Sequence, residues 1–180
     1  GCGAFVANCN RWLPRLLWLL GGLLVPAEIH LLDSTKLPVC RNRRAKRYKV
    51  AAGFVGWGKN WQGFWFGFKL HAAINREGRL SNVTFTPADV YDGHVTPRLV
   101  RPETKIVVGD SHYGDKIARK KLWQEHGVIV VAPLHYKQKT QVMASWQEEL
   151  LHARGKIECM FDRLKENLPL VSSFPGSLDG

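Results

Sequence analysis

Three carboxylates stand where they could build a metal site. Asp33 follows the apolar run 29–32, and Asp110 follows the apolar run 106–108 after one glycine. Both runs are predicted as strands, and ligands bind at strand ends in an α/β sheet. Two unpaired aspartates on adjacent strands would repel each other and raise a pKa, and a divalent cation would relieve this conflict. Oxygen-only ligands favour Mg²⁺ or Mn²⁺ over zinc.

Glu158 could complete such a site from a helix. Apolar residues from Trp146 to Leu168 recur at steps of three and four, which predicts one helix with a core-facing stripe, and Glu158 borders that stripe. Alternatively, Glu158 forms an i,i+4 ion pair with Arg154, although Arg before Glu is the weaker order for such a pair. Taken singly, Asp33 could instead cap a turn, and Asp110 could start a loop.

Hydrophobic periodicity predicts the elements that must position these carboxylates. Residues 64–74 alternate with period two, which predicts a strand with one buried face, and residues 80–86 are predicted to return as its hairpin partner. The other predicted elements are a buried helix over 16–25, a short helix over 87–100 capped by Asp89 and Asp92, a helix over 116–126 closed by Gly127, and a buried strand over 128–132. This order predicts a mixed sheet with helices packed on its faces.

The charge balance favours a polyanionic partner. The chain has 26 Lys and Arg residues against 15 Asp and Glu residues, a formal net charge of +11. Nucleic acid is the commonest such partner, and a merely basic protein is the alternative. One segment is predicted to follow a DNA backbone through salt-sensitive contacts: Arg41, Arg43, Arg44, Lys46, Arg47 and Lys49. Trp57 and Trp61 could stack on a splayed base or pack in the core.

The cysteines and the apolar run 16–25 argue against other classes. Cys2, Cys9, Cys40 and Cys159 form no CxxC pair and no zinc spacing, so we expect neither a structural zinc nor a disulfide framework, and we expect a reducing compartment. The apolar run is too short to cross a membrane, which needs about 20 apolar residues. We therefore expect no membrane partner.

Four segments together resemble the DDE transposases of bacterial insertion sequences. They are residues 33–35, 65–71, 109–115 and 154–158, and the resemblance runs from about Ile29 to Lys165. A signature of one branch of that family, Tyr-x2-Arg-x3-Glu-x6-Lys, fits Arg154, Glu158 and Lys165. Leu151 stands at the tyrosine position, which is a departure. The family's Asp-x-x-Tyr pattern fits Asp110 and Tyr113.

The resemblance implies a ribonuclease-H-like fold and a two-metal site. Asp33 would bridge two Mg²⁺ (or Mn²⁺) ions, and Asp110 and Glu158 would hold one each; ions about 3.5–4 Å apart serve the attacking and leaving oxygens. Water would free a 3′-OH at the element end, which would then attack target DNA. Arg154 and Lys165 would contact phosphate, or alternatively form a solvated helix face. Possible cleft residues are Lys69, His71 and Tyr113.

The resemblance also sets expectations for the whole chain. An N-terminal helical segment over 1–28, left from a longer N-terminal region, would precede a catalytic domain over 29–170, and a truncated loop would follow over 171–180. The partners would be double-stranded DNA and, in the active form, a second copy of the chain, in the bacterial cytoplasm at the nucleoid. The alternatives are an inactive DNA-binding remnant and a nuclease of the same fold that cuts without joining.

Overall fold

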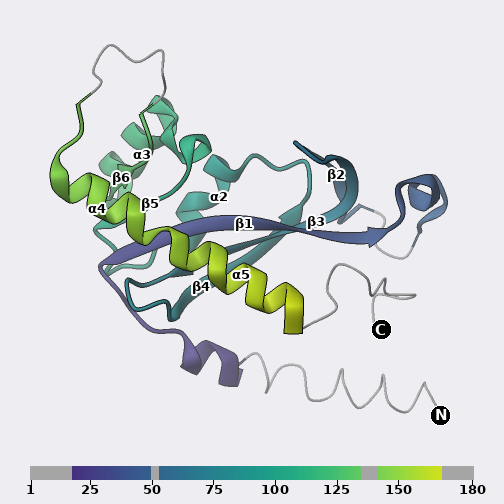
Figure 1. Ribbon diagram of the computed structural model, residues 1–180, viewed down its shortest axis with the longest axis horizontal. Coiled ribbons are helices and arrows are strands. Elements are labelled where there is room, and N and C mark those ends of the chain that lie inside the picture. Colours follow the sequence, from purple (N-terminus) through teal and green to yellow (C-terminus); the bar gives the residue numbers. More distant parts are fainter. Residues whose placement is uncertain (1–17, 50–52, 135–141, 168–180) are drawn as a thin grey trace.

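The computed structural model describes residues 18–49, 53–134 and 142–167 (Figure 1). The expected C-terminal loop 171–180, and most of the expected N-terminal segment, lie outside this range. In chain order the elements are β1 (Ile29–Cys40), η1 (Asn42–Arg47), β2 (Gly56–Asn60), β3 (Gly63–Ile74), β4 (Leu80–Pro87), α2 (Asp92–Leu99), β5 (Ile106–Val108), η2 (Ser111–Gly114), α3 (Lys116–His126), β6 (Ile129–Val131), α4 (Ser145–Ala153) and α5 (Gly155–Asn167).

The strands form one mixed sheet of six. Its order is β2-β3-β1-β5-β6, and β4 also pairs with β3. β3 runs antiparallel to β1, β2 and β4, whereas β1, β5 and β6 run parallel. The predicted hairpin, the mixed sheet and the flanking helices are all present, which confirms the ribonuclease-H-like fold that the resemblance implies.

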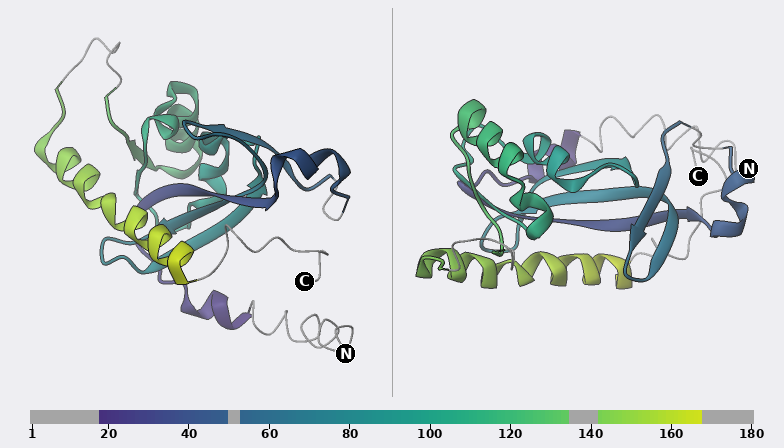
Figure 2. Two further views of the ribbon diagram at one scale, coloured as in Figure 1. Left: turned by 45° about the vertical axis from the view of Figure 1, so that its right-hand side comes forward. Right: turned by 90° about the horizontal axis from the view of Figure 1, so that it is seen from above.

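Helices cover both faces of the sheet (Figure 2). On one face, Leu31, Leu70 and Ile74 pack with Ile157 and Phe161 of α5. On the other face, a second cluster joins the sheet to α2, η2 and α3, and it contains Leu32, Ala73, Leu99, Val107, Tyr113, Leu122, Val128 and Val130. The prediction that β3 buries one face is therefore wrong over residues 70–74, which are buried on both faces because helices lie above and below them.

β1 is much longer than the four residues predicted. It pairs with β5 only as far as Leu31, opposite Val108. Beyond that point it continues beside β3, so Asp33 lies inside the strand and pairs with Ala72. The change from apolar residues to the polar Asp33 marks where the parallel pairing of β1 with β5 ends. The strand itself continues to Cys40.

The β2–β3 hairpin bends away from the plane of the sheet. A β-bulge falls between Pro38 and Cys40, opposite Gly67 and Phe66. A Cβ added at Gly67 would lie 2.2 Å from the carbonyl oxygen of Leu37, so only glycine permits this approach. The Gly/Trp-rich stretch thus contains a strand, β2, that periodicity did not predict, and the predicted basic loop contains the short 3₁₀ helix η1.

Three predicted helices need correction. The short helix predicted from Pro87 begins only at Asp92, and its N-cap, Tyr91, makes no side-chain capping bond. The single helix predicted from Trp146 is interrupted at Arg154, between α4 and α5. The apolar helix predicted as buried is helical over 18–23, but these residues are exposed because no described element packs over them.

The helix predicted over 116–126 and closed by Gly127 is confirmed. Asp115 accepts hydrogen bonds from the backbone N–H groups of Ile117 and Ala118, at 3.1 and 3.0 Å. Gly127 ends the helix in the left-handed conformation, at φ 64°. This helix lies on the α2 side of the sheet.

Candidate active site

Asp33 is held on the face of β1 that α5 covers. It lies two residues beyond Leu31, and alternate residues of a strand share a face, so its side chain is on the side of the Leu31–Ile157–Phe161 cluster. The side chain is 21% exposed. The long strand, paired with β3 on one side, therefore fixes a half-buried carboxylate beside α5.

Asp110 is fixed by a short turn directly after β5. It is the N-cap of η2, and its Oδ1 accepts the backbone N–H of His112 at 2.9 Å. Its Oδ2 lies 3.1 Å from Nδ1 of the same histidine. Because β5 lies parallel to β1 and beside it, this turn brings Asp110 to the same edge of the sheet as Asp33.

Arg154 lies at the interruption between the two C-terminal helices, and Glu158 lies in the first turn of α5. The Arg154 guanidinium donates to Glu158 Oε1 at 2.6 Å, which is the i,i+4 ion pair that the sequence left open. The same guanidinium also lies 3.9 Å from Asp33 Oδ1. One cation therefore stands between the carboxylates of a strand and of a helix that are far apart in sequence.

The charges of Asp110 and Glu158 act on the carboxyl group of Asp33. Burial is the largest cause that raises the pKa of Asp33, to about 6, and the charges of Asp110 and Glu158 add to the rise. The backbone N–H of Ser34 and the charge of Arg154 oppose it. The charges of the other two carboxylates thus reach Asp33 inside a site that water screens poorly.

The donor set fits a hard divalent cation. All three side chains offer carboxylate oxygens, which Mg²⁺ prefers, and the raised pKa of Asp33 shows a charge that the protein only partly compensates. In this arrangement no three His, Cys, Asp or Glu side chains among the described residues are gathered closely enough to hold an ion. An ion would therefore have to draw the carboxylates together, in competition with the contacts of Arg154.

Two of the expected cleft residues lie on the opposite face of the sheet. His71 pairs with Ser34 across β1 and β3, whereas Asp33 pairs with Ala72, so Lys69 and His71 are directed toward α2. Lys69 Nζ donates to Asp92 Oδ1 at 2.6 Å. His71 is fully buried, and burial lowers its pKa to about 4, which keeps the ring neutral at pH 7.

The third expected cleft residue, Tyr113, is buried in the α2-side cluster. Its hydroxyl has no hydrogen-bond partner among the described residues. Burial raises its pKa, and the charges of Asp92, Asp33 and Asp110 add to the rise. The ring supports the turn that carries Asp110, since a Cβ on Gly109 would lie 2.5 Å from it.

A polar cluster behind Asp33 was missed by sequence reasoning. Asp92, which was expected to cap a helix, instead accepts the hydroxyl of Ser34 at 2.8 Å and the ammonium of Lys69. Ser34 is the next residue to Asp33 on β1, so the cluster fixes the strand at the site. Its members lie 58 and 23 residues apart in sequence, and no local pattern connects them.

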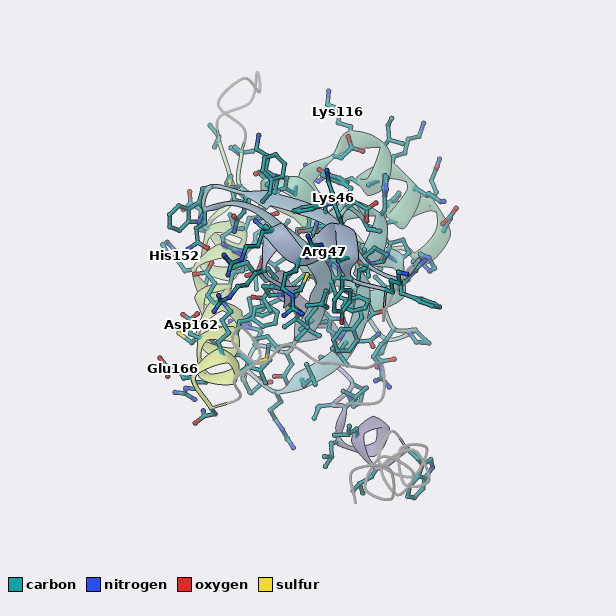
Figure 3. The ribbon with its side chains drawn as sticks, turned by 90° about the vertical axis from the view of Figure 1, so that its right-hand side faces the viewer. Lys46, Arg47, Lys116, His152, Asp162 and Glu166 are labelled. Atoms are coloured by element: carbon teal, nitrogen blue, oxygen red, sulfur yellow. The ribbon has the colours of Figure 1, made fainter. Side chains whose placement is uncertain are left out.

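The expected DNA-contacting cations fall into two groups. Lys165 forms its ion pair with Asp162 on α5, at 3.5 Å, and not with one of the three candidate catalytic carboxylates. The basic segment lies on and around η1, where all six of its cations are exposed and none pairs with a described carboxylate: Arg41, Arg43, Arg44, Lys46, Arg47 and Lys49. Figure 3 shows Lys46 and Arg47 on the end of the molecule that faces the viewer.

A family model described as transposase DDE domain matches residues 25–172. The chain belongs to the transposase DDE domain family. Comparison with curated proteins and with solved structures gave no match. A DDE domain acts on DNA during transposition, and domains of this family generally use divalent metal ions. The matched range contains all three carboxylates and both groups of cations described above.

No helix in the described part of this DDE domain is long and apolar enough to span a membrane. Of its cysteines, Cys40 is buried and Cys159 is exposed, and both are free. Cys2 and Cys9 lie outside the described residues.

Proposed function

We propose that this domain cleaves DNA strands and joins them, with Asp33, Asp110 and Glu158 as its catalytic carboxylates. The observation that carries the proposal is the place of the Arg154 guanidinium, which donates to Glu158 Oε1 at 2.6 Å and lies 3.9 Å from Asp33 Oδ1; in support, burial raises the pKa of Asp33 and the charges of Asp110 and Glu158 add to the rise. Residues 77 (110 − 33) and 48 (158 − 110) apart have no local reason to influence one another. Perturbed carboxylates of this kind are typical of functional sites.

Each carboxylate has a distinct place in this proposal. Asp33 would bridge two Mg²⁺ or Mn²⁺ ions, and Asp110 and Glu158 would hold one each. When bound, such ions lower the pKa of an attacking water and stabilise the leaving oxygen. The turn after β5 orients Asp110, the polar cluster of Ser34, Lys69 and Asp92 fixes β1, and the first turn of α5 presents Glu158.

Arg154 has two roles in the proposed reaction. Without bound ions its guanidinium offsets the charge of Asp33 and Glu158. With the carboxylates neutralised by bound cations, the guanidinium would be available to bind a phosphate of the DNA, for which its planar fork is well suited. The cations of the basic segment would bind the backbone further along the duplex.

The overall reaction has two displacements. First, a water oxygen forms a bond to phosphorus at the element end, and the bond from phosphorus to the 3′ oxygen breaks, which leaves a 3′-OH and a 5′-phosphate. The 3′-OH then attacks a phosphodiester of target DNA and displaces its 3′ oxygen. We propose that the element is a bacterial insertion sequence and that two copies of the chain act together.

Asp110→Asn tests this function. We expect loss of plasmid nicking in Mg²⁺ by at least about 100-fold, because one ligand loses its charge, while affinity for a random duplex changes less than about 2-fold. The matched control is Asp162→Asn, which replaces an exposed carboxylate on α5. It should keep both plasmid nicking and duplex affinity. Wild-type protein that binds duplex but never nicks it would favour an inactive remnant. Nicking without strand transfer would favour a nuclease that only cuts.

A further inference from the structure

Three aromatic rings are exposed along the β2–β3 hairpin. Trp61 lies in the turn and is 91% exposed, Phe64 follows the turn on β3 and is 59% exposed, and Trp57 lies near the start of β2, opposite Phe66, and is 46% exposed. We call Trp57, Trp61 and Phe64 the aromatic tip. Large rings gathered on a surface usually mark a binding site, because water disfavours them there. The alternative that Trp61 packs in the core is therefore wrong.

Two of the three rings of the aromatic tip, Trp57 and Phe64, make fixed contacts with their neighbours. Trp57 packs on the ring of Phe66 with centroids 5.3 Å apart, and Lys59 Nζ lies 5.2 Å above the ring of Phe64. The carbonyl oxygen of Phe64 also accepts a hydrogen bond from Asn42 of η1, at 2.6 Å. A flat surface fixed in advance loses little entropy when a ligand stacks on it.

The segment that carries the aromatic tip has one sign of charge, although the Asp89 carboxylate lies against Gly56 at the start of β2. No Asp or Glu occurs between Asp33 and Glu77, a stretch that includes η1, β2 and β3. The basic segment packs against the base of the hairpin through Ala45, in a cluster with Val39 and Cys40. Lys36 and Lys59 add two more cations. This combination of rings and cations matches a ligand with aromatic faces and negative charge.

The hairpin extends toward the proposed catalytic face. Figure 2 (right) shows it crossing the end of the sheet, from the side of α2 to the side of α5. At the turn, Lys36 Nζ donates to the side chain of Gln62, the neighbour of Trp61. Lys36 lies three residues beyond Asp33 on β1, roughly 10 Å along the strand, and it pairs with Lys69, so its side chain leaves the strand on the face opposite to Asp33. The turn of the hairpin is therefore joined to β1 close to Asp33 along the strand.

We propose that the aromatic tip stacks on unpaired bases of the DNA next to the phosphate that is cut. Base faces are hidden inside a duplex and become available when a strand is splayed or frayed, whereas the phosphates on either side are bound by Lys36, Lys59 and the basic segment. Stacking of this kind accepts any base, because every base has an aromatic face. The inference rests on the proposed function for the place of cutting, but not for the binding itself.

Binding of a 20-nucleotide oligo-dT and of a 20-base-pair random duplex tests the proposal with the full chain. We expect Trp61→Ala to weaken oligo-dT binding by roughly 10-fold and duplex binding by less than about 2-fold, since only the single strand offers base faces. Trp61→Phe should recover most of the loss. Trp123→Ala is the matched control, because Trp123 is 58% exposed but lies on α3.

The outcomes separate this inference from the proposed function. Unchanged oligo-dT binding in Trp61→Ala, an equal loss for duplex, or an equal loss in Trp123→Ala would overturn stacking at the tip, yet plasmid nicking by the wild type would still support the enzyme. Conversely, Asp110→Asn should retain full oligo-dT binding. If Trp61→Ala leaves both affinities unchanged but shifts the sedimentation of the protein, the tip binds a second copy and the inference is wrong.

Discussion

At the scale of single residues, the stability of the domain depends on the charge of Asp33. The carboxyl group titrates at about 6 in the folded chain, against an ordinary value of 3.8. The folded state therefore holds this proton more tightly than the unfolded state does. Stability from this source is complete below pH 4 and is lost as the pH rises through 6, with a total change of about 3 kcal/mol.

Asp33→Asn should remove that dependence when no divalent metal is present. In EDTA, we expect the substitution to raise the free energy of unfolding at pH 7.5 by roughly 2 kcal/mol more than at pH 4.5, because asparagine carries no charge to desolvate. Urea unfolding at the two pH values measures the difference. Asp162→Asn is the control, and its effect should stay within about 0.5 kcal/mol at both values. An equal gain from Asp33→Asn at both pH values would contradict the buried charge.

Residue types and spacing allowed part of the site to be predicted. Asp33, Asp110 and Glu158 stand out because each adjoins an apolar pattern. Their ion-pairing partners were harder to predict. Arg154 suggested a pair with Glu158, but its approach to Asp33 depends on how α5 packs on β1, and spacing along the chain carries no such information.

At the scale of elements, Gly67 allows β3 to approach the backbone of β1 closely at Leu37 and Pro38. We expect Gly67→Ala to lower the free energy of unfolding by about 3 kcal/mol or more, because its Cβ would meet the backbone at Leu37 and Pro38, which cannot rotate away. Thermal and urea unfolding measure the loss. Gly155→Ala is the matched control, since nothing lies within 4 Å of the added Cβ. It should change stability by less than about 1 kcal/mol. Similar losses for both variants would show that close approach is not the cause.

Periodicity predicted the presence of the elements more accurately than it predicted their lengths. Alternation over residues 64–74 identified β3, but the burial of both its faces depends on helices that come later in the chain. The extension of β1 to Cys40 has a similar cause, since pairing with β3 keeps a polar stretch in a strand. The interruption at Arg154 leaves the apolar repeat unbroken, so the repeat alone predicts one helix.

At the scale of the whole molecule, the net charge of +11 is concentrated where carboxylates are absent. We expect replacement of Arg43, Arg44 and Arg47 by glutamine to weaken random-duplex binding and to reduce the slope of log affinity against log salt, by up to about 1 for each phosphate that the protein no longer neutralises. Fluorescence anisotropy from 50 to 200 mM salt measures both quantities.

Three lysines on another element provide the control, because their replacement changes the net charge by the same amount. Lys116, Lys120 and Lys121 are exposed on α3, on the far side of the sheet from α5. Their replacement by glutamine should leave the slope nearly unchanged. If both triple variants lose the same affinity and slope, DNA is attracted by the overall charge and not by the basic segment.

The three carboxylates enter the fold from positions 33, 110 and 158, and this spacing affects what happens while the chain is being made. β1 and its antiparallel partners can pair once β4 has emerged, but α5 comes last. At 5–20 residues per second, Glu158 is synthesised roughly 2 to 10 s after Asp110. Under the proposed roles, a nascent chain can reach DNA with its basic segment well before it holds a complete cutting centre. Under the same roles, the order of translation would delay cutting relative to DNA binding.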